Sequence, residues 1–404
     1  MVLTRKQEEG LKIALERYKH GEKYTCISGY AGTGKSTLIK FIIAAMNLKE
    51  EDVRYIAYTG KAANVLKNKG CPGATTAHKL LYYAKLMPNG KYFFKPKTPG
   101  EMMSEGIKIV VVDEISMLPK TIWNLLCSHS FYILACGDPE QLPPVPDESG
   151  EDPNNHVLDH PHVFLDEIMR QAQESEIIRL SMHIREGKPL FTFPVVEEQV
   201  KIIQKKDLTV PMFMWADQIL CATNRTKNAI NQQIREVKGF DLNHPQVGDK
   251  IINLHNEWNI MSNHNNPLTN GVIGTIKEIE TQKWYYPFWL RNESLSVPII
   301  TATFSGDEQD EEFTMLSFDE QEFLTGTPSL NGKEEYKIKK RIEMPIPLHA
   351  NFGYAITVWK AQGSEWNKVL LFQETGWPKD INERRKYMYT GITRAIDKLV
   401  VVGN

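Results

Sequence analysis

The segment GYAGTGKS, residues 29–36, fits the pattern G-x-x-x-x-G-K-[ST]. It follows the apolar stretch YTCIS (24–28), which predicts a buried strand, and it leads into STLIKFIIAAM (36–46), which predicts a helix. In that context the glycines let backbone N–H groups wrap around phosphates, and the start of the helix adds a positive potential. The segment therefore predicts a nucleotide-binding α/β fold. The alternative, a chance glycine-rich turn, is disfavoured because a predicted strand and a predicted helix flank the segment.

The polar residues of this loop have expected roles. Lys35 is expected to reach the β- and γ-phosphates, and the Ser36 hydroxyl to bind Mg²⁺. Asp113 and Glu114 end the apolar strand IKIVVVDE (107–114), and the carboxyl ends of parallel strands point into the ligand crevice. We expect Asp113 to hold Mg²⁺, directly or through water, and Glu114 to polarise the attacking water. The predicted nucleotide-binding residues of the loop are Gly29, Gly32, Thr33, Gly34, Lys35, Ser36 and Thr37.

Short apolar strands alternate with helical patterns along much of the chain, which predicts parallel sheets covered on both faces. A second α/β unit is expected to start near VFLDEIMRQ (163–171) and to resume at 355–373. Asn89 and Gly90, within 85–101, are a hairpin signal. Between about 246 and 344 the chain is rich in short strands and turns, which predicts an inserted β-barrel.

Composition sets broad limits. The 404-residue chain has a net charge of −2, so any nucleic-acid contact has to come from a local basic groove. The five cysteines form no C-x-x-C pair, which favours reduced thiols. The charged N-terminus is unlike a signal peptide, and no apolar run has the length of a membrane span. We therefore expect a cytosolic protein with no membrane partner.

Further segments indicate what the nucleotide is used for. Gln141, in CGDPEQLPPV, suits a sensor of the γ-phosphate, and Arg170 and Arg394 suit arginines supplied by a second domain. Such arginines stabilise transition-state charge and make domain closure depend on the γ-phosphate. The stretch AITVWKAQGSEW offers three phosphate-contacting side chains, which are Thr357, Lys360 and Gln362.

Nine segments in one order resemble the motifs of the superfamily one helicases, and within them the RecD-like and Dda-like group. They are GYAGTGKST, AYTGKAAN, TTAHKLL, VVDEISM, GDPEQLPPV, IMRQ, CATNRTKNAIN, VWKAQGSEW and YTGITRA. The resemblance covers most of the chain but is weak over 246–344. It implies an ATP-dependent enzyme that uses Mg²⁺, translocates 5′→3′ along single-stranded DNA and separates duplex DNA. It also implies single-strand–duplex junctions as substrates, replication or recombination proteins as partners, and a monomer.

The resemblance also implies a domain plan. Two RecA-like domains would occupy 1–162, and 163–245 with 345–404, with ATP between them. A strand-separating pin would lie at about 84–103, and an SH3-like barrel at 246–344.

Individual residues inherit roles from the resemblance. Gln7 would read the adenine edge. The DNA-facing residues would be Thr59, Lys61, Thr76 and His78 in the first domain, and Thr223 and Asn224 in the second. Phe93 or Phe94 of the pin would stack on bases, and because adjacent strand residues face opposite sides, one of the two would instead pack. Trp359 departs from the family pattern, because a histidine is usual there.

Two other functions remain open. One is an RNA helicase, since superfamily one contains those too. The other is a P-loop ATPase or single-strand binder without motor action, although paired arginines argue against a passive binder. The aromatic run WYYPFW (284–289) is expected to pack within the barrel and the lysines of KEEYKIKK (333–340) to form a solvated face, with nucleic-acid contact as the alternative for each.

Overall fold

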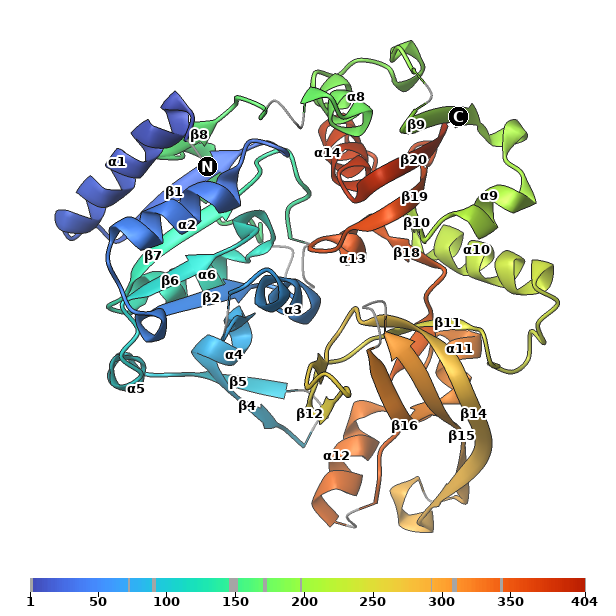
Figure 1. The fold of residues 1–404 in the computed structure, drawn as a ribbon. Coiled ribbons are helices and arrows are strands. Elements are labelled where there is room, and N and C mark those ends of the chain that lie inside the picture. The colour runs from blue at the N-terminus through green and yellow to red at the C-terminus, as the bar shows by residue number, and fades with distance from the viewer. Residues whose placement is uncertain are drawn as a thin grey trace. The chain divides into compact units, whose positions relative to one another are not determined.

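The computed structural model describes residues 3–71, 73–88, 92–144, 152–169, 173–196, 198–291, 293–306, 311–341 and 344–403. The chain divides into two compact units, coloured along the sequence in Figure 1. Unit 1 comprises Met1–Leu81, Pro96–Ala222 and Thr357–Asn404, and unit 2 comprises Tyr82–Lys95 and Thr223–Ile356. Within the described ranges, no helix combines the length and apolar character needed to cross a membrane.

Unit 1 holds a six-stranded parallel sheet with the strand order β3-β2-β6-β7-β1-β8 (Figure 1). Its strands are β1 (Tyr24–Gly29), β2 (Val53–Ala57), β3 (Thr75–Thr76), β6 (Ile109–Val112), β7 (Tyr132–Gly137) and β8 (Val163–Leu165). Every residue of β6 and β7 is buried, as expected for parallel strands that are covered on both faces. The continuous apolar runs in the sequence arise from this double burial.

Helices connect and cover these strands. They are α1 (Arg5–Lys19), α2 (Lys35–Ala45), α3 (Gly60–Asn68), α4 (Ala77–Leu81), α5 (Pro99–Ser104) and α6 (Lys120–Ser128), with short 3₁₀ turns at Glu50–Asp52, Ile115–Met117 and Val157–Asp159. Thr4 and Gln7 form a capping box that starts α1. Ala14 of α1 and Leu38 of α2 pack on Ile27 and Leu134 in the core beneath them. This packing fixes where α2 begins relative to the end of β1.

Strand β8 corrects one predicted boundary. The sequence placed the start of the second α/β unit near residue 163, but β8 pairs with β1 in the first sheet, with Ile27 opposite Val163 and Gly29 opposite Leu165. Val163 and Leu165 are buried in the same core as α1 and α2. A three-residue apolar strand carries no signal of which sheet it joins, so the boundary could not be set from the sequence.

The second sheet of unit 1 has the order β18-β10-β19-β20-β9. Its strands are β9 (Val200–Gln204), β10 (Gln218–Cys221), β18 (Ala355–Thr357), β19 (Trp366–Phe372) and β20 (Ala395–Gly403). Its helices are α8 (Glu176–Arg185), α9 (Val210–Trp215), α13 (Val358–Ala361) and α14 (Ile381–Ile392), with 3₁₀ turns at Leu190–Thr192 and Lys205–Asp207. Helices α8 and α14 pack on each other and on β20. The prediction of two parallel-sheet α/β layers is confirmed.

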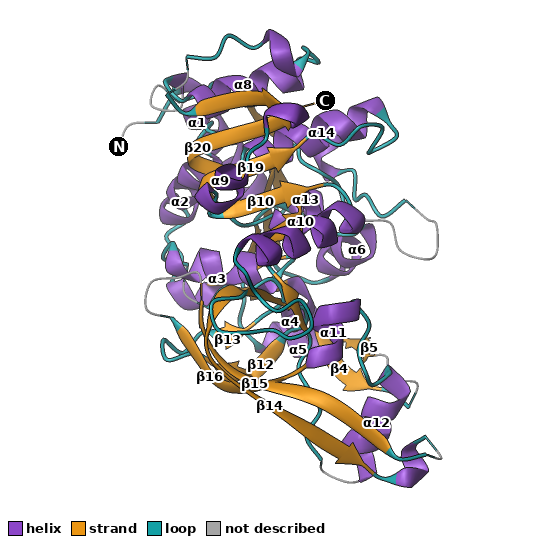
Figure 2. Cartoon of the chain, turned by 90° about the vertical axis from the view of Figure 1, so that its right-hand side faces the viewer, coloured by secondary structure: helices purple, strands orange, loops and turns teal. Residues whose placement is uncertain are grey.

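Unit 2 contains the predicted hairpin and insertion (Figure 2). The hairpin pairs β4 (Tyr82–Leu86) with β5 (Tyr92–Pro96), and its turn at Asn89 and Gly90 lies outside the described residues. The insertion is an antiparallel sheet with the order β16-β15-β14-β11-β17, accompanied by the β12-β13 pair. Besides the hairpin, unit 2 contains the following helices and strands: α10 (Asn224–Val237), which precedes the insertion, and then β11 (Lys250–Asn253), β12 (Glu257–Met261), β13 (Pro267–Leu268), β14 (Ile273–Tyr286), β15 (Leu295–Gly306), β16 (Glu312–Asp319), α11 (Glu320–Thr325), α12 (Gly332–Arg341) and β17 (Ala350–Phe352). A 3₁₀ turn, η6 (Phe288–Leu290), lies between β14 and β15. The sheet thus extends past the predicted end at 344, and its SH3-like nature stays a prediction.

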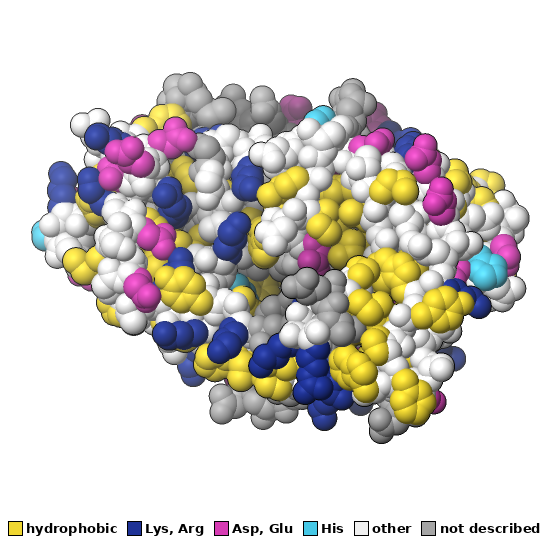
Figure 3. All heavy atoms as spheres, turned by 90° about the horizontal axis from the view of Figure 1, so that it is seen from below, with side chains coloured by type: hydrophobic (Ala, Val, Ile, Leu, Met, Phe, Trp, Pro, Cys, Tyr) yellow, Lys and Arg dark blue, Asp and Glu magenta, His cyan; other side chains and the backbone are white. Residues whose placement is uncertain are grey.

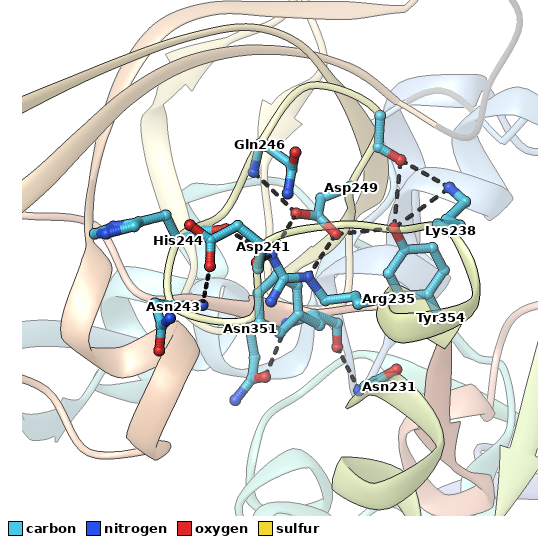
Figure 4. A network of polar contacts seen from close by, with 12 residues as sticks. Asn231, Arg235, Lys238, Asp241, Asn243, His244, Gln246, Asp249, Asn351 and Tyr354 are labelled. Atoms are coloured by element: carbon cyan, nitrogen blue, oxygen red, sulfur yellow. Dashed lines mark hydrogen bonds and ion pairs between the residues drawn. The ribbon is translucent and has the colours of Figure 1, made fainter. Parts of the chain in front are cut away.

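A buried ion pair joins α10 to the insertion (Figure 4). Arg235 Nε donates to Asp249 Oδ1 at 2.9 Å and its Nη2 donates to Asp249 Oδ2 at 3.1 Å. Tyr354 donates its hydroxyl to Asp249 Oδ1 at 2.9 Å, and Arg235 also donates to the carbonyls of Asp241 and His244. Buried charges are tolerated only when they are paired and hydrogen-bonded, and this pair meets that requirement.

Candidate nucleotide site

The loop after β1 has the backbone that a phosphate cradle needs. Gly32 and Gly34 have φ of +77° and +78°, in the left-handed region that glycine adopts without strain. A Cβ on Gly29 would lie 2.7 Å from the Leu165 carbonyl oxygen, so β8 also requires a glycine at that position. The first turn of α2 follows directly with Lys35, exposed Ser36 and Thr37, which aims backbone N–H groups into the loop.

Lys35 sits at the centre of the loop. Its Nζ donates to the Gly29 and Tyr30 carbonyls, at 2.8 Å and 2.9 Å. The cation therefore already lies where phosphate oxygens would replace these carbonyls. The glycine backbone, the lysine and the start of the helix together fit the phosphates of a nucleoside triphosphate.

Gln7 is buried against the back of the loop. Its Nε2 donates to the Thr33 carbonyl at 3.3 Å, and its Oε1 accepts from the Thr4 backbone N–H at 3.0 Å. The structure thus brings Gln7 to the nucleotide loop. Its predicted reading of the adenine edge stays a prediction.

Two carboxylates follow β6. Burial raises the pKa of Asp113, and the Lys35 ammonium opposes that rise. Burial likewise raises the pKa of Glu114, and the Arg394 guanidinium opposes it. Glu114 has a left-handed backbone, with φ of +51°, and its Oε2 has no hydrogen-bond partner among the described residues. A buried carboxylate oxygen without a partner fits a residue that binds a water, and Asp113 with Ser36 would hold Mg²⁺.

Arg394 reaches Glu114 from the second sheet. It lies two residues after α14 and is buried, with Nη1 3.7 Å from Glu114 Oε1. The guanidinium is held by the Thr390 and Ser364 carbonyls, at 3.2 Å and 3.3 Å. The structure thus brings together two predicted catalytic residues that are far apart in sequence. Arg170, the other predicted arginine, lies outside the described residues.

The segment after β7 links the two sheets. Gln141 is buried there, and its Oε1 has no partner in the part of the chain that the structure describes. The next residue, Leu142, accepts from Gln362 Nε2 at 2.9 Å through its carbonyl and donates its N–H to Thr390 Oγ1 at 3.0 Å. Gln362 is therefore buried between two motifs, and its predicted contact with DNA stays a prediction.

Sequence reasoning missed two residues that contact the loop. The Arg185 guanidinium, at the end of α8, lies 3.6 Å from the centroid of the Tyr30 ring, and its Nη1 is buried with no partner in the described ranges. Tyr389 accepts from the Ala31 N–H at 2.9 Å and donates to Asp138 Oδ2 at 2.6 Å. Tyr389 is the first residue of YTGITRA, so its motif was a signal, whereas no motif marks Arg185.

Several predicted DNA-facing residues of unit 1 lie at helix starts. Thr59 caps α3 and Thr357 caps α13, accepting from Ala62 and Lys360 backbone N–H groups. Lys360 is exposed. A helix start capped by a threonine presents N–H groups to a phosphate, which is compatible with the predicted roles.

The remaining three of these residues are more enclosed. Lys61 Nζ lies 5.0 Å from the centroid of the Trp366 ring. Thr76 is buried, and its hydroxyl accepts from the Lys79 N–H at 3.2 Å. His78 lies near the Tyr58 ring, and burial lowers its pKa, so a neutral ring is favoured. Their contacts with DNA stay predictions.

Unit 2 holds the other predicted DNA contacts. Thr223 caps α10 and Asn224 begins it, exposed. Phe93 is 53% exposed and Phe94 is 41% exposed. Phe94 also meets the Tyr82 ring edge-on at 5.9 Å, so within the described part of the hairpin Phe94 has an aromatic packing partner.

Trp359 has a packing role in place of the usual family histidine. Its ring lies 5.9 Å from the Tyr387 ring, tilted by 31°. The larger aromatic side chain thus fills space against α14.

Comparisons with known proteins agree with this geometry. A family model described as an AAA domain matches residues 3–207, which is just over half of the chain, and a model described as a UvrD-like helicase C-terminal domain matches residues 352–402. The ATP-dependent RecD2 DNA helicase of Deinococcus radiodurans is 23% identical over 95% of this chain, which spans only 47% of that protein. The ATP-dependent DNA helicase dda of Enterobacteria phage T4 is 23% identical, over 97% of each chain.

Solved structures show the same fold. The Pif1 helicase from Candida albicans matches with a TM-score of 0.52 and 16% identity, over 100% of this chain and 94% of that one. Bacteroides Pif1 bound to ssDNA matches with a TM-score of 0.55 and 16% identity, over 99% and 92%. The two parallel sheets of unit 1 are accordingly RecA-like. The chain belongs to the family described as an AAA domain, and its sequence is similar to those of the RecD2 and dda DNA helicases.

Proposed function

We propose that the chain is an ATP-dependent 5′→3′ DNA helicase, which translocates on single-stranded DNA and unwinds duplex DNA. The observation that carries the proposal is the position of Arg394, 3.7 Å from Glu114. An arginine on the second sheet beside a carboxylate on the first makes hydrolysis depend on both, which is what a two-domain motor requires. The names of the RecD2 and dda relatives support DNA as the substrate and ATP as the nucleotide that is hydrolysed.

The chemistry follows from the residues around the loop. The loop amides and Lys35 bind the phosphates, and Ser36 with Asp113 would hold Mg²⁺, which would neutralise developing phosphate charge. Glu114 orients a water and accepts its proton. Arg394 stabilises transition-state charge, and Gln141 senses the γ-phosphate.

DNA handling is assigned by the same proposal. The first RecA-like domain comprises residues 1–162 together with β8, and the second comprises the remainder of 163–245 with 345–404. The hairpin β4-β5 is the strand-separating pin, and the insertion is the SH3-like barrel. Grip alternates between the two domains as ATP closes and hydrolysis opens them. The substrates are single-strand–duplex junctions, and the partners are replication or recombination proteins. The compartment is the cytosol, which suits five cysteines that are all free.

The test is the ATPase rate with and without single-stranded DNA, and with single-stranded RNA in parallel. We expect strong stimulation by DNA that Lys35→Ala abolishes, because Lys35 is the cation at the loop centre. Lys40→Ala, at an exposed position of the same helix, is the matched control and is expected to leave the rate unchanged. Stimulation by RNA alone would move the chain to the RNA helicases. Equal turnover with and without nucleic acid would leave only a P-loop ATPase.

A further inference from the structure

The far end of the β14-β15 hairpin carries three exposed aromatic side chains. Tyr285 is 70% exposed, Phe288 is 64% exposed and Trp289 is 39% exposed. All three belong to the run WYYPFW, and two of them lie in η6 (Phe288–Leu290). Large exposed apolar surface of this kind marks a binding surface more often than a structural one.

The exposure does not result from a loose tip. Tyr286 and Leu290 are buried in one core with Val297 and Ile338. Tyr286 donates its hydroxyl to the Pro345 carbonyl at 2.9 Å. Neighbours on both sides of the exposed rings are therefore anchored.

A charged contact clamps the same segment to α12. Arg291 donates from Nε and Nη2 to the two carboxylate oxygens of Glu334, at 2.6 Å and 2.8 Å. The pair is bidentate and Glu334 is buried, so it fixes both distance and orientation. The buried residues Tyr286 and Leu290 and the paired Arg291 therefore hold the exposed aromatic rings of this segment in place.

Helix α12 presents several basic side chains near the exposed aromatic rings. Its two carboxylates turn inward, Glu334 to Arg291 and Glu335 to His349 at 3.1 Å. Its five cations are all exposed, and they are Lys333, Lys337, Lys339, Lys340 and Arg341. The Arg341 guanidinium carbon lies 5.6 Å from the centroid of the Trp289 ring. On the face drawn in Figure 3, Lys and Arg side chains gather beside large hydrophobic ones.

We propose that this aromatic–basic tip, meaning Tyr285, Phe288, Trp289 and the exposed cations of α12, is an accessory binding surface for single-stranded nucleic acid. The inference rests on the proposed function, and it adds a contact outside the motor motifs. Exposed rings beside lysines suit a single strand, because bases stack on the rings while the cations neutralise phosphates. A duplex keeps its base faces inside the stack, so it would use only the cations.

The test compares oligothymidines of increasing length for binding to the nucleotide-free protein. The variant is Tyr285→Ala/Phe288→Ala, and both side chains are exposed enough for the fold to tolerate their loss, which thermal unfolding checks. We expect wild-type affinity to keep rising beyond the length that saturates ATPase stimulation. The variant should lose about tenfold or more on long strands and nothing on the shortest. Met103→Ala, which removes a similarly exposed side chain of unit 1, should match wild type.

A charge variant tests the second half of the surface. Lys337→Gln/Lys340→Gln is expected to lower the slope of log affinity against log salt on long strands, because fewer counterions are released. Unchanged slope would overturn the role of α12.

Other outcomes separate the alternatives. Equal affinity of wild type and the aromatic variant at every length would overturn the tip proposal alone. An equal loss on blunt duplex would overturn its preference for single strands. A concentration-dependent dimer that the aromatic variant dissolves would assign the surface to a second copy instead. Absence of ATPase stimulation at every strand length in wild type would instead contradict the proposed motor function, whatever the affinities show.

Discussion

Arg394 Nη1 lies 3.7 Å from Glu114 Oε1, although the two residues follow elements of different sheets. Among the described residues, the Arg394 guanidinium donates hydrogen bonds to Thr390 and Thr393 at the end of α14 and to Ser364 just before β19, all on the side of the second sheet. Any movement of one sheet against the other would therefore change the distance between the arginine and the carboxylate. In the proposed motor, this pair would link the position of the second RecA-like domain to hydrolysis.

Replacing Arg394 should stop turnover with little effect on ATP binding. We expect Arg394→Gln to lower the DNA-stimulated kcat by about a thousandfold, since an arginine supplied to a phosphoryl-transfer site contributes about that much. The KM for ATP should change far less, because the loop and Lys35 remain. Steady-state kinetics measure both. Lys19→Gln, at an exposed position of α1, is the control, and a rise in KM at constant kcat would contradict the role.

The same variant should shift the pH dependence. Glu114 accepts a proton only as a carboxylate, so the rate falls as pH drops through its pKa. Burial raises that pKa and Arg394 lowers it, so Arg394→Gln should move the acid limb of the kcat profile to higher pH. Residual activity from pH 5 to 9 provides the measurement. An acid limb that stays in place would show that another group controls it.

Arg185 is expected to contribute through its contact with Tyr30. The cation–π contact is worth ~0.5–2 kcal/mol, so Arg185→Gln should lower kcat/KM for ATP by about twofold to thirtyfold. Tyr30→Phe keeps the ring and should be near wild type, whereas Tyr30→Leu should resemble Arg185→Gln. Lys188→Gln, just beyond the same helix, is the matched control. Wild-type kinetics for both Arg185→Gln and Tyr30→Leu would remove Arg185 from the site.

The sequence predicted the parts of the fold whose signal is local. Strands such as β6 and β7 are buried on both faces and so read as continuous apolar runs, and the loop at Gly29–Ser36 needs glycines wherever it occurs. The hairpin β4-β5 was confirmed for the same reason, because its turn signal lies within a few residues.

The unpredicted parts depend on contacts between distant segments. The placement of β8 beside β1 is decided by the core around α1 and α2, not by its own three residues. The burial of Gln362 follows from its bond to Leu142, more than two hundred residues earlier. Arg185 has no motif, and only its approach to Tyr30 reveals it.

The buried pair of Arg235 and Asp249 should be a major source of stability in unit 2. Asp249→Ala leaves a buried guanidinium uncompensated, which costs about 3–5 kcal/mol of unfolding free energy. Urea denaturation of the variant measures the loss. Glu51→Ala breaks an exposed pair with Lys49 and should cost less than about 1 kcal/mol. Similar losses from both variants would mean that burial does not set the energy of the Arg235 pair.

His349 should make the stability of unit 2 depend on pH. Burial alone would lower the pKa of His349, but its hydrogen bonds to Glu322 and Glu335 outweigh burial and raise the pKa to about 10. A raised pKa means that the protonated ring stabilises the fold fully below pH of about 6.5, and that this stabilisation is lost as pH rises toward 10. His349→Gln should therefore be strongly destabilising at pH 6 and much less so at pH 10.

Thermal unfolding across that range measures the difference between wild type and His349→Gln. His244→Gln is the control, because His244 is mostly exposed, with Nδ1 2.7 Å from Glu320 Oε1. Its effect should be small at every pH. A constant penalty for His349→Gln from pH 6 to 10 would show that the ring acts by packing and not by charge.

The hairpin β4-β5 should couple to unwinding and not to translocation. Phe93 and Phe94 are both exposed, so Phe93→Ala should leave stability and DNA-stimulated ATPase unchanged. A stacked base contributes ~1–3 kcal/mol, so the unwinding rate of a forked duplex should fall about fivefold or more. Phe94→Ala should have the smaller effect, because Phe94 already packs on Tyr82. Leu324→Ala, with comparable exposure in unit 2, is the control, and a parallel fall of ATPase and unwinding in Phe93→Ala would assign the hairpin to DNA grip instead.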